Sequence, residues 1–263
     1  DDMTFANELA KLGDFYVNDA FGAAHRNHTS TAKLARVLKP AVSGLLMEKE
    51  LRCLSEALDN PTRPFTAVVG GAKVSSKIGV LENLIDKVDN LIIGGGMAYT
   101  FVKANGGKIG NSICEDDQIE VAKAIEKKAA DKGVKLVMAT DVLVADDFSG
   151  NGTNKFVKIN EIPDGFEGVD AGEESRKAFA DVLKSSKTIL MNGPVGAFEN
   201  PKFAEGTKAV LAAIVEATKN GATSVIGGGD SVSAAKKFAK AEDFTHVSTG
   251  GGASLEFIEG KVL

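Results

Sequence analysis

Residues 65–73, FTAVVGGAK, pass from a short apolar segment directly into two glycines and a lysine. A similar order returns at 90–97 (NLIIGGGM), 224–230 (SVIGGGD) and 245–253 (THVSTGGGA). Short segments rich in Val, Ile and Leu are typical of parallel strands that are buried on both faces. The repeated order therefore predicts several buried strands that each end at a glycine-rich loop.

Six segments of this kind are expected to form one sheet, with helices between most of them. The expected strands are Phe65–Val69, Asn90–Ile93, Lys135–Met138, Thr188–Met191, Ser224–Ile226 and Thr245–Val247. Val74–Val88 spaces its apolar residues 4, 3, 4 and 3 apart, and Asp116–Ala130 and Pro201–Thr218 are also expected to be helices. This alternation predicts a three-layer α/β/α fold around a six-stranded, mainly parallel, Rossmann-like sheet.

Three regions depart from the alternation. Residues 142–160 are interpreted as a strand, a polar turn and a second strand attached to the main sheet. Residues 1–42 are interpreted as the remnant of a second α/β domain. The apolar stripe in Ser43–Leu58 predicts a helix that ends before Asn60-Pro61 and connects the two parts.

The composition fits a globular protein and argues against several other classes. Apolar residues make up 43% and charged residues 25% of the chain, close to the average of globular domains. The net charge of −5 argues against a nucleic-acid or membrane-surface partner. Cys53 and Cys114 are far apart and lack metal-ligand spacing, which is typical of reduced thiols in an intracellular protein.

The placement of the glycines indicates a ligand. In a parallel sheet, the loops after the strands lie at one edge, and ligands bind there in open α/β folds. Glycine permits close backbone approach, and a following helix presents free N–H groups to an anion. Glycine-rich loops follow five of the expected strands, including the loop at 192–196 (NGPVG), and predict a ligand that carries phosphate.

Two common nucleotide motifs are absent from the sequence. GxGxxG fails at both candidate places, because Tyr99 and Val232 stand at the third glycine position. GxxxxGK[ST] is absent as well. Dinucleotide binding and a P-loop therefore lose support.

Charged residues beside the loops are candidate ligands of phosphate and metal. Lys73 and Lys77 are spaced i, i+4 at an expected helix start, where two cations oppose the helix dipole unless an anion binds. Two solvated surface lysines are the alternative. Asp230 stands at a strand terminus, where a carboxylate can hold Mg²⁺ together with substrate phosphates. It could equally cap the helix expected at Ser231–Phe238.

Four further residues have both a functional and a structural interpretation. Ser231 can cap that helix or contact phosphate, and Glu199 can bind a ribose or be a surface acid. His25 and Arg26 stand beside a loop of small residues, and an arginine can hold a carboxylate or phosphate with two hydrogen bonds. The alternatives are a structural hydrogen bond at His25 and a surface charge at Arg26.

Six stretches together resemble the phosphoglycerate kinase family. They are NDAFGAAHR (18–26), GGAKVSSKI (70–78), IIGGGMAYTF (92–101), NGPVGAFE (192–199), IGGGDSVSAA (226–235) and STGGGASLEFIEGK (248–261). They follow one another in order over nearly the whole chain, which makes the resemblance specific. The departure is length, since most of the family's N-terminal domain and its C-terminal tail have no counterpart here.

The resemblance implies three parts. Residues 1–42 would be the end of the N-terminal domain that binds 3-phosphoglycerate, 43–60 the interdomain hinge helix, and 61–263 the nucleotide-binding domain.

The resemblance also implies the site. Its nucleotide-binding residues would be Gly71, Lys73, Lys77, Gly95, Gly96, Gly168, Val169, Asn192, Pro194, Ala197, Glu199, Gly228, Gly229, Asp230 and Ser231. Asp230 would bind the Mg²⁺ of the nucleotide, and His25 and Arg26 would bind the acid substrate. The catalytic residues would be Lys77, Arg26, Gly228 and Gly229.

The activity implied by the resemblance is Mg²⁺-dependent phosphoryl transfer between 1,3-bisphosphoglycerate and ADP, which gives 3-phosphoglycerate and ATP reversibly. The expected partners are these small molecules, with no nucleic acid and no membrane, and a monomer is expected. We expect a cytoplasmic, glycolytic protein. A plastid form that serves carbon fixation stays open, because a transit peptide would precede Asp1.

Two alternative functions are weighed against this one. An NAD-linked oxidoreductase on a similar sheet is disfavoured by the failure of GxGxxG and by the Lys73 and Lys77 pair. A nucleotide-binding module with little turnover is favoured if the 263 residues act alone.

Overall fold

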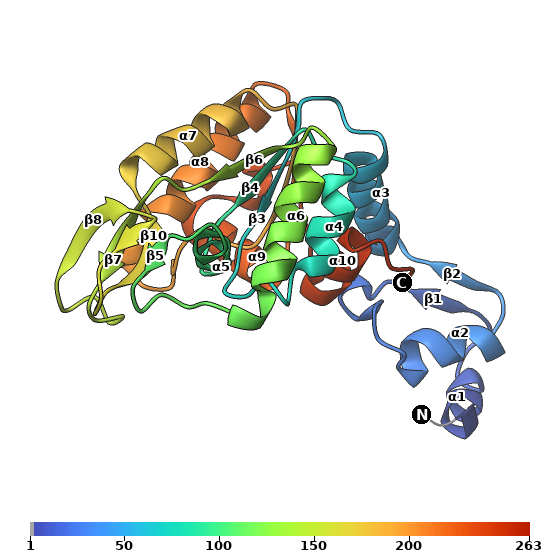
Figure 1. Cartoon of the computed structure of the whole chain (residues 1–263). Coiled ribbons are helices and arrows are strands. Elements are labelled where there is room, and N and C mark those ends of the chain that lie inside the picture. The colour runs from blue at the N-terminus through green and yellow to red at the C-terminus, as the bar shows by residue number, and fades with distance from the viewer. Residues whose placement is uncertain (1–2) are drawn as a thin grey trace.

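The computed structural model describes residues 3–263, which form a broad α/β body and a smaller N-terminal extension (Figure 1). The body is built on one parallel sheet with the strand order β13-β12-β11-β3-β4-β6. Its strands are β3 (Phe65–Val69), β4 (Asn90–Ile93), β6 (Lys135–Met138), β11 (Thr188–Asn192), β12 (Thr223–Gly227) and β13 (His246–Val247). The expected fold class and all six expected strands are confirmed, with ends that differ by one residue at most.

Alternate residues of the central strands enter two separate cores, which explains why the segments are apolar throughout. Phe65, Ala67 and Val69 of β3 join one core, whereas Val68 between them joins the other. The first core is completed by α3 (Leu45–Asp59), α4 (Ile78–Ile85), α5 (Met97–Ala104), α6 (Ile119–Asp131) and α10 (Gly251–Ile258). The second is completed by α7 (Glu173–Lys184), α8 (Glu205–Lys219) and α9 (Gly229–Phe238). A parallel sheet is thus covered on both faces, as such sheets require.

The helix expected at Val74–Val88 is shorter than the apolar spacing predicted. It begins at Ile78, with Lys77 at the N-cap, so Lys73 lies in the turn before it. In that turn the Lys77 N–H donates to the Val74 carbonyl at 2.8 Å, and the Ser76 hydroxyl donates to the Lys73 carbonyl at 2.8 Å. Serine hydroxyls compete in this way with helical hydrogen bonding. The expectation that both lysines occupy the first helical turn is therefore wrong.

The start of α9 also differs from expectation. The helix begins at Gly229, with Gly228 at the N-cap, so Asp230 lies in the first turn and is not the cap residue. Gly228 has φ +87°, a left-handed conformation that favours glycine. The chain therefore turns into the helix two residues earlier than the Asp230 capping alternative required.

The expected strand–turn–strand at 142–160 is confirmed, but its attachment to the main sheet is wrong, because both strands belong to a separate three-stranded sheet. β7 (Asp141–Ala145) pairs antiparallel with β8 (Asn154–Lys158) on one side and with β10 (Glu167–Ala171) on the other. A second small pairing joins β5 (Lys108–Ile109) to β9 (Glu161–Ile162). β10 was not anticipated, because Gly168 and Asp170 interrupt its apolar pattern.

The N-terminal extension consists of α1 (Met3–Ala10), α2 (Leu34–Val37) and the short parallel strands β1 (Tyr16–Asn18) and β2 (Ala41–Ser43). It leads into α3, the expected hinge helix. Asp19 holds the start of α3, because its Oδ1 accepts a hydrogen bond from the Met47 N–H at 2.9 Å. Met47, Leu54 and Leu58 of α3 are buried in the core of the body.

Candidate active site

The glycine-rich loops converge at the carboxyl edge of the sheet, as expected. From β3 the chain proceeds outward to β4 and β6, and from β11 it proceeds in the opposite direction to β12 and β13. The point between β3 and β11 is therefore a topological switch point, where open α/β sheets bind ligands. A cavity of about 310 Å³ opens there between the loops.

Most of the expected nucleotide-binding residues line this cavity. They are Gly71, Gly95, Gly96, Gly168, Val169, Pro194, Ala197, Glu199 and Asp230. The remaining members of the expected set, Lys73, Lys77, Asn192, Gly228, Gly229 and Ser231, are not among its lining residues. Lys77 and Asn192 nevertheless meet each other nearby, as described below.

Close backbone packing explains the glycines at the two central loops. A side chain on Gly70 would collide with the carbonyl of Pro194, and one on Gly193 would collide with the carbonyl of Gly70. Gly193 also has φ +108°. The loops after β3 and β11 can therefore touch only because both positions lack a Cβ atom.

Lys77 and Asn192 form a polar pair at the switch point. The Lys77 Nζ donates a hydrogen bond to the Asn192 Oδ1 at 2.5 Å. Burial lowers the pKa of Lys77, while the nearby charges of Asp230 and Glu259 oppose that shift. A cation is thus held in a partly desolvated place, where its attraction for an anion is stronger than in bulk water.

The amide nitrogen of Asn192 has no hydrogen-bond partner within the described residues 3–263, although its side chain is fully buried. A Cβ atom placed on Gly228 would lie 3.0 Å from that nitrogen, so the amide faces the start of α9. The first N–H groups of any helix also lack intrahelical acceptors. An unpaired amide, a half-buried lysine and a helix N-terminus together form a set of donors suited to phosphate oxygens.

Asp230 fits a magnesium ion that is shared with a ligand. It is exposed in the first turn of α9 and lines the mouth of the cavity. Residues 3–263 contain no group of three or more His, Cys, Asp or Glu side chains that could hold a metal by themselves. Mg²⁺ commonly takes one or two carboxylates and completes its coordination with water and substrate phosphates. A single carboxylate beside an anion site matches that pattern.

The other expected phosphate and ribose contacts differ in accessibility. Ser231 is fully buried, and its Oγ accepts a hydrogen bond from the Gly193 N–H at 2.5 Å. Lys73 is exposed in its turn, and Glu199 is exposed at the cavity. The buried hydroxyl of Ser231 therefore holds the loop after β11, while Lys73 and Glu199 are free to meet a ligand.

His25 and Arg26 lie outside the cavity, on the N-terminal extension. The His25 ring packs against the start of α10, since a Cβ atom on Gly252 would lie 2.5 Å from its Nε2. The neighbouring Gly251 packs against the start of α9, where a Cβ atom would lie 3.1 Å from the Gly229 nitrogen. The glycine-rich start of α10 thus touches both the His25–Arg26 region and the α9 N-terminus.

A family model described as phosphoglycerate kinase matches residues 1–261. This chain belongs to the phosphoglycerate kinase family. Members of the family are kinases that transfer phosphoryl groups, which agrees with the set of hydrogen-bond donors at the switch point. Within residues 3–263, no helix combines the length and apolar character that crossing a membrane would require.

Two solved structures show how far the similarity extends. Phosphoglycerate kinase from Coxiella burnetii is 44% identical, with a TM-score of 0.93, and the match covers 100% of this chain and 67% of that one. Phosphoglycerate kinase from Pyrococcus horikoshii OT3 is 30% identical, with a TM-score of 0.84 and the same coverage of both chains. The chain therefore spans about two thirds of these relatives, in agreement with the expected partial chain.

Sequence reasoning missed a buried network that ties α3 to the loop before α10. Glu50 of α3 is fully buried, and its Oε2 lies 2.7 Å from the His246 Nε2. Its Oε1 accepts hydrogen bonds from the Thr249 N–H at 2.6 Å and from the Thr249 hydroxyl at 2.7 Å. Burial alone would raise the pKa of Glu50, but these hydrogen bonds hold it below its usual value. The expected hinge helix is thereby bonded to the glycine-rich start of α10.

Sequence reasoning also missed several residues of the cavity wall. Tyr99, Ile113, Phe148 and Glu167 line it, but none belongs to a motif with recognisable spacing. Phe148 is 55% exposed and packs against Phe203, with ring centroids 6.1 Å apart. Exposed aromatic and aliphatic side chains at the mouth of a cavity suit a flat, partly apolar ligand group.

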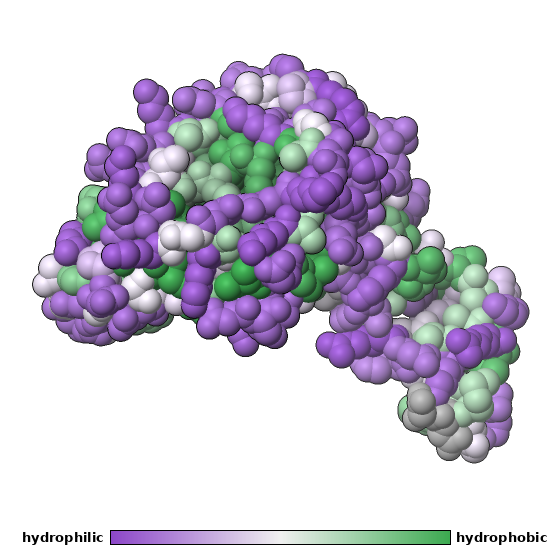
Figure 2. All heavy atoms as spheres, in the orientation of Figure 1, coloured by the Kyte–Doolittle hydropathy of each residue, from purple (hydrophilic) through white to green (hydrophobic). Residues whose placement is uncertain are grey.

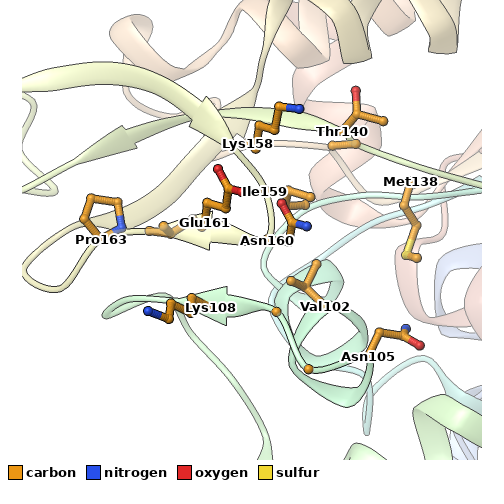
Figure 3. Close-up of a pocket in the computed structure, with 14 residues that line it drawn as sticks. Val102, Asn105, Lys108, Met138, Thr140, Lys158, Ile159, Asn160, Glu161 and Pro163 are labelled. Carbon is orange, nitrogen blue, oxygen red and sulfur yellow. The ribbon is translucent and has the colours of Figure 1, made fainter.

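A wider groove of about 1000 Å³ lies elsewhere, beside α5, β8 and β9 (Figure 3). Its walls include Asn105, Lys108, Thr140 and Lys158. In Figure 3 the two lysine side chains point away from each other, and none of the expected site residues lines the groove. The expected site residues therefore gather at the smaller cavity, where the glycine loops converge, and not at the wider groove.

Proposed function

We propose that this protein performs the Mg²⁺-dependent, reversible transfer of a phosphoryl group between 1,3-bisphosphoglycerate and ADP, giving 3-phosphoglycerate and ATP. The observation that carries the proposal is the unpaired, buried amide of Asn192, which stands beside the Lys77 ammonium and faces the start of α9. Buried donors without acceptors are rare in proteins, and this one is available to a phosphate oxygen.

The substrates would occupy two sides of one junction. The base and ribose of the nucleotide would fill the cavity at the switch point, with Glu199 near the ribose. Its phosphates would extend toward Lys77 and the Gly228–Gly229 start of α9. 3-Phosphoglycerate would approach from the His25 and Arg26 side, which the start of α10 joins to α9.

The chemistry needs positioning and charge stabilisation more than covalent work. An oxygen of the ADP β-phosphate attacks the phosphorus of the acyl phosphate, and the bond from that phosphorus to the carboxyl oxygen breaks. The carboxylate leaves with the electron pair, so the step requires no protein nucleophile and no proton transfer. Negative charge on the transferred group is stabilised by Lys77, by Arg26 and by the N–H groups of Gly228 and Gly229.

The metal and the hinge complete the proposal. A Mg²⁺ ion held by Asp230 and the nucleotide phosphates would neutralise phosphate charge. Bending near α3 would bring the N-terminal part over the nucleotide and exclude water, which limits hydrolysis of the acyl phosphate. We further propose a monomer that acts on these small molecules in the cytoplasm, within glycolysis; a plastid form would serve carbon fixation.

A second candidate is a nucleotide-binding module with little turnover. It is favoured by one observation, namely that the chain covers 67% of its solved relatives. His25 and Arg26 are the proposed ligands of the acid substrate in this chain, and a single arginine provides little charge for a substrate with several negative groups.

Calorimetry with ADP and Mg²⁺, together with a coupled assay for ATP-dependent phosphorylation of 3-phosphoglycerate, tests both candidates. We expect clear ADP binding and turnover near background for these 263 residues alone. Turnover well above background would refute the module, and absence of ADP binding would refute both. In a family member that carries the remaining third, Lys77→Ala should reduce phosphoryl transfer far more than ADP binding, whereas Lys123→Ala on the surface of α6 should change neither.

A further inference from the structure

Residues 110–116 (GNSICED) form a strap that connects β5 to α6 along the wall of the nucleotide cavity. Ile113 of the strap lines the cavity and packs on the loop after β4, since a Cβ atom on Gly96 would lie 2.5 Å from its Cγ2. Ser112 accepts a hydrogen bond from the Gly168 N–H at 2.8 Å. The strap thus touches two parts of the cavity wall that come from distant regions of the sequence.

The strap also holds the turn that carries Lys73 and Lys77. Both carboxylate oxygens of Glu115 accept hydrogen bonds from Ser75, one from its N–H at 3.0 Å and one from its hydroxyl at 2.5 Å. Ser75 lies midway between the two lysines. These two hydrogen bonds join Ser75 to a segment that is 40 positions away in the sequence.

Glu115 is itself anchored to a rigid element. Its N–H donates to the Thr100 Oγ1 at 3.2 Å, and Thr100 is buried on α5. The next residue, Asp116, forms an ion pair of 2.7 Å with Lys103 of the same helix. Because α5 packs in the first core, the carboxylate of Glu115 presents its two oxygens from a fixed place.

We propose that Glu115 is a positioning residue of the phosphate site, which fixes through Ser75 the turn that bears Lys73 and Lys77. The inference rests on the proposed nucleotide-binding function. A flexible turn would have to be ordered when the ligand binds, and that ordering weakens affinity. A turn already held by two hydrogen bonds to a carboxylate presents its cations without that cost.

The direction in which ADP affinity changes when Glu115 is removed distinguishes a positioning role from a simple effect of its charge. Glu115 is an anion near a site for anions, so by Coulomb attraction and repulsion alone its removal should strengthen ADP binding. If Glu115 positions the lysine turn, its removal should weaken ADP binding instead. Hydrogen bonds to charged groups are worth enough to predict a loss of about tenfold.

Calorimetry of ADP with Mg²⁺ at constant ionic strength tests the proposal in the 263-residue chain. Glu115→Ala is expected to weaken ADP binding about tenfold with an unchanged melting temperature. Glu120→Ala is the matched control: it removes the same charge from the nearby α6, where Glu120 pairs with the surface residue Lys123. The control is expected to bind ADP as the parent does, or slightly more tightly.

Two further variants test the contact itself. Glu115→Gln keeps an oxygen for the Ser75 N–H and an amide that can donate to the Ser75 hydroxyl, so ADP affinity should return to near the parental value. Ser75→Ala should weaken ADP binding by a smaller factor than Glu115→Ala. In the double variant, the two losses of ADP affinity should not add in full, because both changes remove the same interaction. Hydrogen exchange at the Ser75 amide should accelerate in Glu115→Ala.

The outcomes distinguish this inference from the function on which it rests. A parent chain that does not bind ADP overturns both. A parent that binds ADP, together with a Glu115→Ala variant that binds it equally well or more tightly, overturns the positioning role alone. Equal weakening in Glu115→Gln and Glu115→Ala also overturns it, because Glu115→Gln keeps the hydrogen bonds to Ser75 on which the positioning role depends.

Discussion

The parallel strands of the N-terminal extension (residues 3–44) and those of the sheet body (residues 61–263) differ in how far they are buried. In the body, every residue of β3 and β11 is buried. In the extension, β1 and β2 expose Val17 and Val42, and the nearby Phe15 is 62% exposed. Figure 2 shows apolar surface on the extension, at the lower right of the view.

The difference teaches where the stability of this chain resides. A parallel sheet needs cover on both faces, and two strands without such cover are marginal in water. The body provides two cores of its own. The extension depends on contacts with the body, among them the buried Phe21 and the bond from Asp19 to the start of α3.

The largest expected effect compares two phenylalanines, one from each region. Phe65→Ala in β3 should lower the free energy of unfolding by about 3 to 5 kcal/mol, because a fully buried ring leaves a cavity. Phe15→Ala should change it by about 0.5 kcal/mol or less, as expected for an exposed position. Urea denaturation measures both. Similar losses for the two variants would mean that the extension has a core of its own.

The next effect concerns the network that joins α3, the helix between the two regions, to the loop before α10. Glu50→Ala should lower the free energy of unfolding by about 3 kcal/mol, because it leaves His246 and Thr249 without their buried partner. Glu48→Ala, on the exposed side of the same helix, is the control and should have little effect.

The same network predicts a pH dependence with a definite sign. The pKa of Glu50 is lowered from 4.5 in the folded protein, so the unfolded state binds its proton first as the pH falls. The stability that Glu50 contributes is therefore present above about pH 4.5 and is lost at lower pH. Urea midpoints measured from pH 7 to pH 3 should fall less steeply in Glu50→Gln than in the parent. An identical slope would contradict the lowered pKa.

A substitution at Lys77 should lower the affinity for ADP with little change in the stability of the body. Lys77→Met removes a partly desolvated charge but also the hydrogen bond to the buried Asn192 Oδ1, so the two effects oppose each other and the melting temperature should change little. ADP affinity should fall about tenfold or more, since the ammonium is a proposed phosphate ligand. Thermal melts and calorimetry on one preparation test both parts. A variant that melts earlier but binds ADP normally would show that Lys77 serves the fold.

The smallest effect compares two aromatic residues of the β7–β8 hairpin, one in the turn and one in the middle of β8. Phe148→Ala should weaken ADP binding by a few fold, because this ring lines the cavity. Phe156→Ala removes a similarly exposed ring, 51% against 55%, away from the cavity and should leave binding unchanged. Competition with a fluorescent ADP analogue would resolve the difference. Equal effects would indicate that the hairpin acts as a whole.

The six strands of the main sheet could be predicted to within one residue because their signals are local and strong. The run Phe65–Val69 is apolar throughout and ends at Gly70, which leaves few alternatives to a buried strand. The helix after it was predicted too long, because the spacing of apolar residues gives no information about the hydrogen bond from the Ser76 hydroxyl to the backbone. β10 was missed since it carries a buried carboxylate, Asp170.

Asp170 illustrates why such residues escape sequence patterns. Burial raises its pKa to about 7, although hydrogen bonds from the N–H groups of Gly206 and Ala171 oppose the shift. Those donors belong to the start of α8 and to β10 itself. The sequence around Asp170 does not indicate that they lie close to its carboxylate. Glu50 is similar, because its partners are nearly two hundred positions away.

The sequence by itself determined the alternation of strands and helices and the glycine loops at one sheet edge, and it predicted phosphate binding at that edge. These follow from short-range physics: apolar period, backbone freedom of glycine and the donors of a helix start. Only the tertiary structure decided that Lys77 meets Asn192, that Glu115 holds Ser75 and that Glu50 joins α3 to α10. Such contacts depend on which distant segments pack together, and local patterns carry no information about that pairing.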